Sequence, residues 1–306
     1  MTAIDQTPRY QQLFKSGALS KRCDEVHQQL AECRICPWDC AINRHAGQVG
    51  VCKTGHLAKV YSFGPHMGEE DPLRGRRGSG TIFFSRCNLR CQYCQNHDIS
   101  QTDVGSEVST VRLAEIMLRL QQSGCHNINF VSPSHVVPQI VLAVYEAARM
   151  GLRIPLVYNT GGYGSPSTLM LLDGIIDIYM PDMKYADADT ARKYSRIEDY
   201  PQINQAAVLE MHRQVGDLHI NLQGLATHGL LVRHLVLPNG LAGTEKIAKF
   251  LADQVSRETY INIMAQYRPA YNAYRYPDLN RPIAPDEFLA AMDAARSAGL
   301  HRFDHH

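Results

Sequence analysis

From residue 80 onward, short apolar segments alternate with longer segments whose apolar residues recur at helical spacing. Buried strands are indicated at 81–84, 127–131, 154–158, 176–180, 230–237 and 260–264. Strands that alternate with helices are typical of βα units that build a parallel sheet. Six such units are too few for a closed eight-stranded barrel. The sequence therefore predicts an α/β fold with an open, partial (β/α)6 barrel.

Two helical segments have recognisable ends. Ser109 is a candidate N-cap for a helix over 111–123, and Gly124 lies just past its last turn. A helix over 285–298 has Pro285 in its first turn and Gly299 as its stop. Because functional side chains of such folds lie at the carboxyl ends of the strands, we expect the chemistry in the loops that follow them.

The cysteines divide the chain into two regions. All nine lie within the first 125 residues, in two groups with two isolated members. Between the groups, the segment 71–80 is rich in Gly and Arg and has the turn signals of a connector. We expect a small, helical, cysteine-rich N-terminal region over residues 1–70 and the partial barrel over residues 71–306.

Charge and hydropathy exclude several classes of protein. Lys and Arg total 31 against 30 for Asp and Glu, so no basic excess favours nucleic acid as a partner. The N-terminus lacks the apolar core of a signal peptide, and no run of about 18 apolar residues predicts a membrane span. An odd number of cysteines in a chain of this size favours metal or redox use of thiols over disulfides. We expect a cytoplasmic protein.

Three cysteines follow the first predicted strand on one loop, Cys87-Asn-Leu-Arg-Cys91-Gln-Tyr-Cys94. Three cysteines at these offsets arise by chance about 0.01 times per chain of this composition. Thiolates are soft ligands that select iron–sulfur clusters or zinc. Because the loop has no fourth cysteine, a metal bound there keeps one coordination position open.

This loop resembles the signature of the radical S-adenosylmethionine (SAM) enzymes, CxxxCxxC with an aromatic residue before the last cysteine. Other segments resemble the branch related to the pyruvate formate-lyase activating enzyme, namely 127–138, 157–163, 172–185, 231–238 and 265–269. The resemblance runs from about residue 20 to about residue 300. It is specific for the superfamily and the branch, but not for a substrate.

The resemblance implies that Cys87, Cys91 and Cys94 bind three irons of a [4Fe-4S] cluster, while SAM chelates the fourth. Reduction of the cluster then cleaves SAM to methionine and a 5′-deoxyadenosyl radical that abstracts hydrogen from the substrate. It also implies an external one-electron donor such as flavodoxin or ferredoxin. Tyr93 would lie beside the adenine. The alternatives are a zinc site or free thiols for the cysteines, and an ordinary loop position for Tyr93.

One stretch departs from the family pattern. The usual Gly-Gly-Glu, which helps hold the amino group of SAM, aligns here with Pro133-Ser134-His135. Ser134 is therefore a candidate SAM contact, and its alternative role is to cap the helix that follows. The sequence leaves open how the amino group is held.

In the activating enzyme, two Asp and one Thr border a monovalent cation beside the SAM carboxylate. They align here with Asn159, Thr160 and Asp182. An amide oxygen is still a ligand for a hard cation, so the resemblance implies a candidate cation site. The alternative is that Asn159 and Asp182 are turn and cap residues at strand ends.

Lys184 and Arg233 match family residues at strand ends, and we expect them to meet the SAM carboxylate. Ordinary salt bridges are the alternative for both. His234 should point to the opposite face of its strand, because side chains alternate.

Cys33, Cys36, Cys40 and Cys52 form a second group of thiols. Four cysteines within 20 residues approach the ligand count of a closed metal site. Their spacing does not choose between an auxiliary iron–sulfur cluster, a structural zinc and unligated thiols.

The sequence thus predicts a radical SAM oxidoreductase. The family likeness suggests an activase that installs a glycyl radical on a partner enzyme, and the alternative is an enzyme that modifies a small metabolite or peptide. A non-catalytic iron–sulfur or zinc protein would have no use for the motif at 180–184. The substrate and the oligomeric state stay open.

Overall fold

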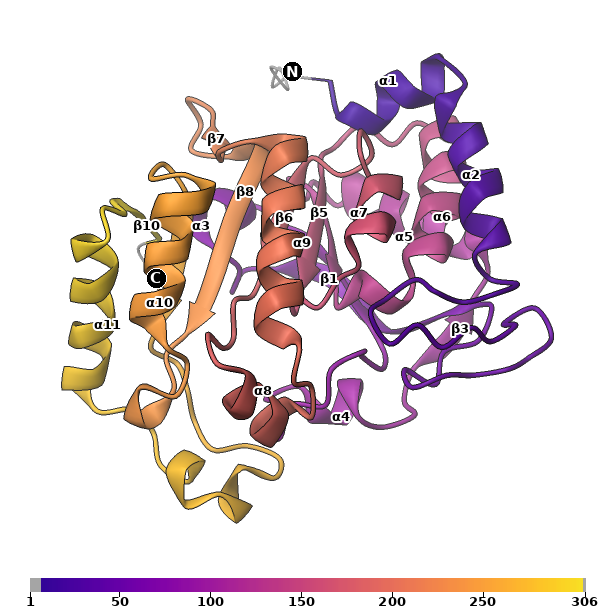
Figure 1. The fold of residues 1–306 in the computed structure, drawn as a ribbon. Coiled ribbons are helices and arrows are strands. Elements are labelled where there is room, and N and C mark those ends of the chain that lie inside the picture. Colours follow the sequence, from indigo (N-terminus) through magenta and orange to yellow (C-terminus); the bar gives the residue numbers. More distant parts are fainter. Residues whose placement is uncertain (1–6, 305–306) are drawn as a thin grey trace.

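A computed structural model describes residues 7–304 (Figure 1). Its strands form one sheet in the order β10-β9-β8-β6-β5-β4-β2-β1-β3, with β7 paired to β8 outside this path. The strands are β1 (Ala58–His66), β2 (Ser79–Phe84), β3 (Ser106–Val108), β4 (Ile128–Val131), β5 (Leu156–Thr160), β6 (Ile178–Pro181), β7 (His219–Ile220), β8 (Ala226–Leu235), β9 (Tyr260–Met264) and β10 (Arg302–Phe303). The run from β2 through β4, β5, β6 and β8 to β9 is parallel throughout. The six predicted strands and the open α/β barrel are confirmed.

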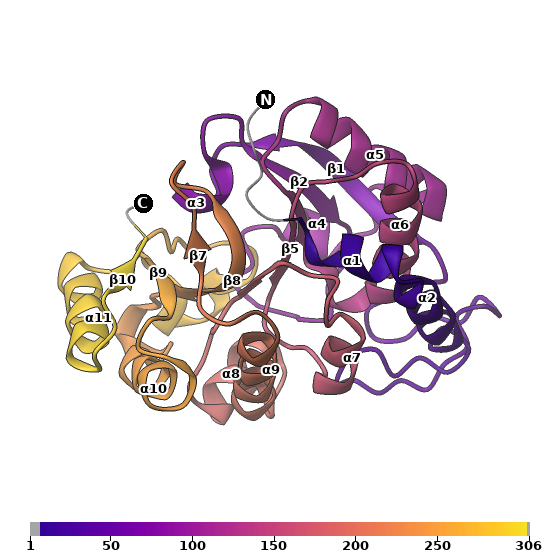
Figure 2. The same ribbon diagram turned by 90° about the horizontal axis from the view of Figure 1, so that it is seen from above.

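The helices, most of which form an arc outside the strands, can be followed from above in Figure 2. They are α1 (Arg9–Lys15), α2 (Ala18–Gln28), α3 (Asp71–Arg74), α4 (His97–Ser100), α5 (Thr110–Gln122), α6 (Val137–Arg149), α7 (Pro166–Leu171), α8 (Ala188–Ser195), α9 (Tyr200–Val215), α10 (Thr244–Phe250) and α11 (Pro285–Ser297). The predicted ends of α5 are confirmed, because Ser109 Oγ accepts from Arg112 N at 3.2 Å and Gly124 has a φ of 87°. Helix α11 also lies where it was expected.

Side chains alternate between the two faces of the parallel strands and form a separate core on each face. Outward side chains such as Phe84 and Phe130 lie in one core with Leu113 of α5 and Ile140 of α6. Each such residue, fully buried, contributes roughly 1.5–3 kcal/mol. The sheet is therefore held mainly by the helices on its outer face.

Inward side chains form a second, smaller core inside the barrel. Val157, Ile178, Leu231 and Tyr260 meet there with Leu73 from α3. The segment 71–80, expected to be a connector, thus places α3 against the inside of the sheet. Leu73 is completely buried in this inner core.

Residues before 70 contribute to the same sheet and to the outer layer. Strand β1, which the sequence did not reveal, pairs antiparallel with both β2 and β3. Helices α1 and α2 pack against α6. The division of the chain at residue 70 stays a prediction.

Candidate active site

The three-cysteine loop follows β2 and lies at the carboxyl edge of the sheet. In Figure 1, β8 points downward, and α4 and α8 lie below the strands at this edge. Cys91 Sγ accepts from Ser195 Oγ of α8 at 3.0 Å, and Cys94 Sγ lies 3.2 Å from Ser100 Oγ of α4. Leu89 N donates to Cys87 Sγ at 3.4 Å. Two helix ends and the loop backbone thus position the three sulfurs.

The thiols are close enough to influence one another. Burial raises the pKa of Cys91 to about 12, the nearby Lys184 lowers it, and Cys94 and Cys87 raise it. Burial also raises the pKa of Cys87, with Cys94 acting in the same direction. The loop therefore brings the three thiols together beside two cations, Lys184 and Arg90.

An aromatic shell surrounds the loop. Tyr93 is buried, with its ring centroid 6.2 Å from that of Tyr185 and 5.9 Å from that of Tyr267. Leu89 and Tyr200 belong to the same cluster. Cys91 is buried in this shell, and Cys87 and Cys94 pack against it partly exposed. The expected position of Tyr93 beside adenine stays a prediction.

The donor set fits an iron–sulfur cluster better than a single ion. Within residues 7–304, no three His, Cys, Asp or Glu side chains are arranged to hold one metal ion. A [4Fe-4S] cluster does not require that arrangement, because each cysteine binds a different iron. Three soft thiols on one buried loop, with no fourth, suit such a cluster with one iron left free.

Four predicted residues meet at the ends of β5, β6 and β8. Asp182 Oδ2 accepts from Lys184 Nζ at 2.6 Å, and Asp182 Oδ1 accepts from Arg233 Nε at 2.9 Å. Arg233 Nη2 donates to Asn159 Oδ1 at 2.8 Å. Burial favours a higher pKa for Asp182, but Arg233 and Lys184 together lower it below its ordinary value. The two cations are thus fixed on one carboxylate.

Ser134 and Thr160 are linked across neighbouring strand ends. Their hydroxyl oxygens are 2.7 Å apart, and helix α6 has no side-chain cap. The alternative role of Ser134 as a helix cap is therefore wrong. His135 Nε2 lies 3.0 Å from Ser85 O, and burial lowers the pKa of His135 to about 3, so the ring is neutral and donates there.

His234 points away from this group, as alternation predicts. Its Nδ1 lies 2.7 Å from Met183 O, and its Nε2 lies 2.9 Å from Thr244 Oγ1. Arg233 faces the inside of the barrel and His234 faces α10.

Two residues that the sequence did not single out hold the strand-end loops. Tyr200 Oη lies 2.8 Å from Gly161 O and 3.0 Å from Asp182 O. Asn204 Nδ2 donates to Gly162 O at 3.1 Å and to Asp182 O at 3.0 Å. Both project from α9 one turn apart. Their i, i+4 spacing in the sequence was the signal that could have placed them on one face of this helix. A Cβ at Gly162, whose φ is +78°, would lie 2.2 Å from Asn204 Nδ2, so this loop requires glycine.

Comparison with known proteins identifies the domain that carries these residues. A model of the Radical SAM superfamily matches residues 81–223. These residues are a radical SAM domain. The family implies a [4Fe-4S] cluster, SAM and an external electron donor, and it supports cleavage of SAM by iron–sulfur chemistry.

One curated relative spans most of the chain. It is the Uncharacterized protein MJ0674 of Methanocaldococcus jannaschii, 29% identical over 294 residues, which are 94% of this chain and 80% of the relative. Solved structures of lower similarity include a radical SAM methyltransferase from Sphaerobacter thermophilus (15% identity, TM-score 0.47, 74% of this chain and 67% of that one). Another is HydG, a maturase of the [FeFe]-hydrogenase (14% identity, TM-score 0.47, 70% of this chain and 47% of that one).

The second group of thiols lies beside the radical SAM loop. Cys33, Cys36 and Cys52 are buried, and Cys40 is partly exposed. Burial raises the pKa of Cys36 to about 12, and all three other thiols raise it as well. A Cβ at Gly50 would lie 2.7 Å from Cys40 Sγ, so glycine permits this close approach.

Hydrogen bonds join the two cysteine loops. Trp38 Nε1 donates to Asn88 O at 2.7 Å, next to Cys87. The guanidinium groups of Arg86 and Arg90 donate to backbone carbonyls at positions 53 and 51. The N-terminal loop is therefore fixed directly on the loop that carries the cluster ligands.

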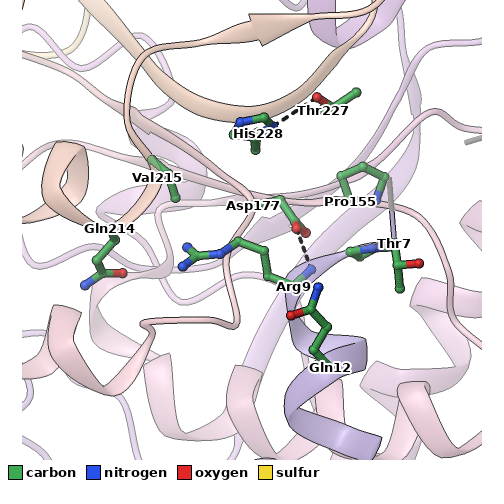
Figure 3. A pocket seen from close by; sticks show the side chains of 10 residues that line it. Thr7, Arg9, Gln12, Pro155, Asp177, Gln214, Val215, Thr227 and His228 are labelled. Carbon is green, nitrogen blue, oxygen red and sulfur yellow. Dashed lines mark hydrogen bonds between the residues drawn. The ribbon is translucent and has the colours of Figure 1, made fainter. Parts of the chain in front are cut away.

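A cavity of about 190 Å³ lies at the opposite, amino edge of the sheet (Figure 3). Asp177 Oδ1 accepts from Arg9 N, and its Oδ2 accepts from Leu156 N, both at 2.8 Å. Burial raises the pKa of Asp177 to about 7. Because ligands of open α/β sheets bind at the carboxyl edge, we assign this group to anchoring α1.

Among residues 7–304, no helix has the length and apolar character needed to cross a bilayer.

Proposed function

We propose that the protein is a radical SAM enzyme in which Cys87, Cys91 and Cys94 hold the [4Fe-4S] cluster. The enclosed three-thiol loop at the carboxyl edge of a radical SAM domain carries this proposal. When bound, the cluster supplies one electron that cleaves SAM and generates a 5′-deoxyadenosyl radical. The residues around it exclude water and hold the cofactor in place.

The strand-end residues fit a role in binding SAM. Lys184 and Arg233 would hold its carboxylate, and Asp182 fixes the direction of both cations. Ser134, Asn159 and Thr160 border the same region with polar atoms. A monovalent cation there would compete with two fixed side-chain cations for Asp182, and this site stays a prediction.

The first test is cluster and cofactor chemistry in the wild-type protein. Anaerobic purification and reconstitution should give about four irons and matching sulfide for the three-cysteine site. After reduction with dithionite, the protein should convert SAM to 5′-deoxyadenosine and methionine, measured by chromatography. A protein that holds only zinc, or that holds the cluster and leaves SAM intact, would contradict the proposal.

Removing either cation should weaken SAM binding. Lys184→Met and Arg233→Met each delete a charged hydrogen bond to a carboxylate, which costs about 1.5–3 kcal/mol when the pair is partly buried. Calorimetry on the reconstituted protein should therefore show a clearly larger Kd for SAM. Lys193→Met is the control, because Lys193 is exposed and pairs with Asp278. Wild-type affinity in both variants would place the SAM carboxylate elsewhere.

The substrate decides between the two kinds of radical chemistry. Activation of a glycyl radical enzyme and modification of a metabolite or peptide both use hydrogen abstraction by the same radical. The buried acid pair Glu69 and Glu70 inside the barrel favours a small-molecule substrate. We further propose that the enzyme acts in the cytoplasm with flavodoxin or ferredoxin as the electron donor.

We also propose that Cys33, Cys36, Cys40 and Cys52 hold a second metal, either an auxiliary iron–sulfur cluster or zinc. All four thiols surround one another, and Gly50 leaves room for this approach. Four thiols satisfy the coordination of either metal.

Cys36→Ser should release this second metal and lower the thermal stability of the protein, because metal binding contributes to folding. The loss of about four irons would indicate a cluster, and the loss of one zinc would indicate a structural site. Cys23→Ser is the control, because Cys23 lies on α2 outside both groups. An unchanged metal content and melting temperature in Cys36→Ser would mean that the second site does not exist.

A further inference from the structure

Two adjacent acidic residues are buried where the chain enters the inside of the barrel. Glu69 and Glu70 have only 6% and 4% of their surface exposed. They directly precede α3, whose Leu73 lies in the inner core. Carboxylates are rarely buried unless they are paired or bind a ligand.

Glu70 is only partly satisfied. Its Oε1 accepts from Asn262 Nδ2 of β9 at 3.1 Å, and Arg233 Nε lies 3.9 Å from the same atom. Its Oε2 accepts no hydrogen bond from any other residue type in the described chain, and its carboxyl group lies within hydrogen-bond reach of the carboxyl group of Glu69. Arg233 cannot supply this bond readily, because it is held by Asp182 and Asn159.

The charges around the pair do not balance when all groups are ionised. Three carboxylates, on Glu69, Glu70 and Asp182, face the two cations Arg233 and Lys184. Asp71 and Arg74 of α3, which follow the pair, form an ion pair with each other and leave this difference unchanged, and Tyr260 of β9 adds no cation. Burial raises the pKa of Glu69 to about 7. The neighbouring Glu70 also raises this pKa, whereas Arg233 lowers it. Near neutral pH, the pair therefore retains a proton.

A separate residue on the inner face of β4 also lacks partners. Asn129 is completely buried, and neither its Nδ2 nor its Oδ1 has a hydrogen-bond partner in the described chain. Asn127 points to the same face and donates to Leu73 O at 2.8 Å. This face of β4 therefore lies against the segment that carries the acid pair. A buried amide with no partner indicates that a polar group is missing from its surroundings.

We propose that Glu69 and Glu70 bind the ammonium or guanidinium group of a small-molecule substrate inside the barrel, with Asn129 as a further hydrogen-bond partner. Ionised carboxylates only accept hydrogen bonds, and a cation supplies both donors and the missing charge. A neutral or anionic group would leave the excess negative charge buried. The bound cation replaces the proton that the pair holds when the site is empty.

The position of the pair suits a substrate of the proposed radical chemistry, on which this inference rests. Contacts run from Glu70 to Arg233, from Arg233 to Asp182, and from Asp182 to Lys184, whose charge acts on Cys91. The acid pair thus lies inside the barrel, a few side chains from the cluster loop.

Calorimetry with four small probes tests the proposal on the reconstituted protein with SAM bound. The probes are n-butylguanidinium, n-butylammonium, n-pentanol and pentanoate. At pH 8 the two cations should bind measurably and the other two should not. At pH 6 the Kd of the cations should rise about tenfold, because the proton must leave from a carboxyl group that titrates near pH 7.

Variants locate the site. Glu70→Gln should raise the Kd of the cationic probes at least tenfold and leave the Kd of SAM unchanged, whereas Glu107→Gln, on exposed β3, should change neither. Should Glu70→Gln fail to fold, Glu69→Gln should bind the cations weakly and without pH dependence. Equal binding of pentanol or pentanoate, or cation binding within twofold of wild type in both variants, would overturn the proposal. A loss of SAM affinity with unchanged cation binding would also overturn it, because the pair would then serve SAM.

Formation of 5′-deoxyadenosine in the absence of any probe is measured on the same wild-type sample. Its absence would contradict the proposed function. The calorimetry tests cation binding by Glu69 and Glu70 independently of this result.

Discussion

Cys91→Ala is expected to reduce 5′-deoxyadenosine formation from SAM to the level of a protein-free control. Only three thiols on the loop are available to the cluster, and Cys91 lies at its centre, in contact with Ser195. With one of the three ligands removed, the two remaining thiols no longer hold the cluster. SAM then has no free iron to bind. Cys87→Ala and Cys94→Ala should have the same effect. The measurements are product formation after dithionite reduction and the iron content of the purified variant.

Cys125→Ala is the matched control for this series. Cys125 is equally buried, but it belongs to the outer core beneath α5. The control should retain iron and activity. Full activity in any of the three loop variants, or an equal loss in Cys125→Ala, would contradict the assignment of the cluster ligands.

Asp182→Asn is expected to give a large loss of stability. The change keeps the size of the side chain but leaves Lys184 and Arg233 without their shared countercharge in a largely buried setting. Breaking a buried ion pair costs about 3–5 kcal/mol, and the slight exposure of these side chains places the loss near the lower end. Urea unfolding should show this as a lower midpoint. Asp278→Asn, which breaks an exposed pair with Lys193, should cost about 1 kcal/mol or less.

The difference in stability between wild type and Asp182→Asn is expected to depend on pH. The folded protein holds the pKa of Asp182 below its ordinary value, so the ion pairs contribute fully above the ordinary range of about 4. This contribution is lost as the pH falls through the lowered pKa. Wild type and Asp182→Asn should therefore approach each other in stability in acid. A constant difference down to the lowest pH at which both fold would contradict this account.

The strands of the barrel could be predicted because they are short, apolar and bounded by turns. Strand β1 has no such signature, since its Gly64 and Pro65 interrupt the apolar pattern. Pairing with β2 and β3, rather than its own propensity, makes it a strand. Strands of this kind depend on tertiary contacts that periodicity does not reveal.

Residue types predicted the cluster loop, but not the partners of the charged residues. Lys184 and Arg233 were expected at strand ends, and they lie there. That both would bind Asp182 depends on how the strands curve toward one another. Glu69 and Glu70 look like solvated loop residues in the sequence, and only the path of α3 across the barrel buries them.

The continuity of the sheet beyond the matched domain limits how far the chain can be shortened. Residues 81–223 contain β4, β5 and β6 and the second part of β2, whereas β1 pairs with β2 on one side and β8 pairs with β6 on the other. A chain cut to these residues would expose the backbone hydrogen-bonding groups of β2 and β6 at two open edges. Such edges are templates for aggregation. Residues 58–66 and 226–235 therefore cover the edges of β2 and β6, in addition to any part they play in catalysis.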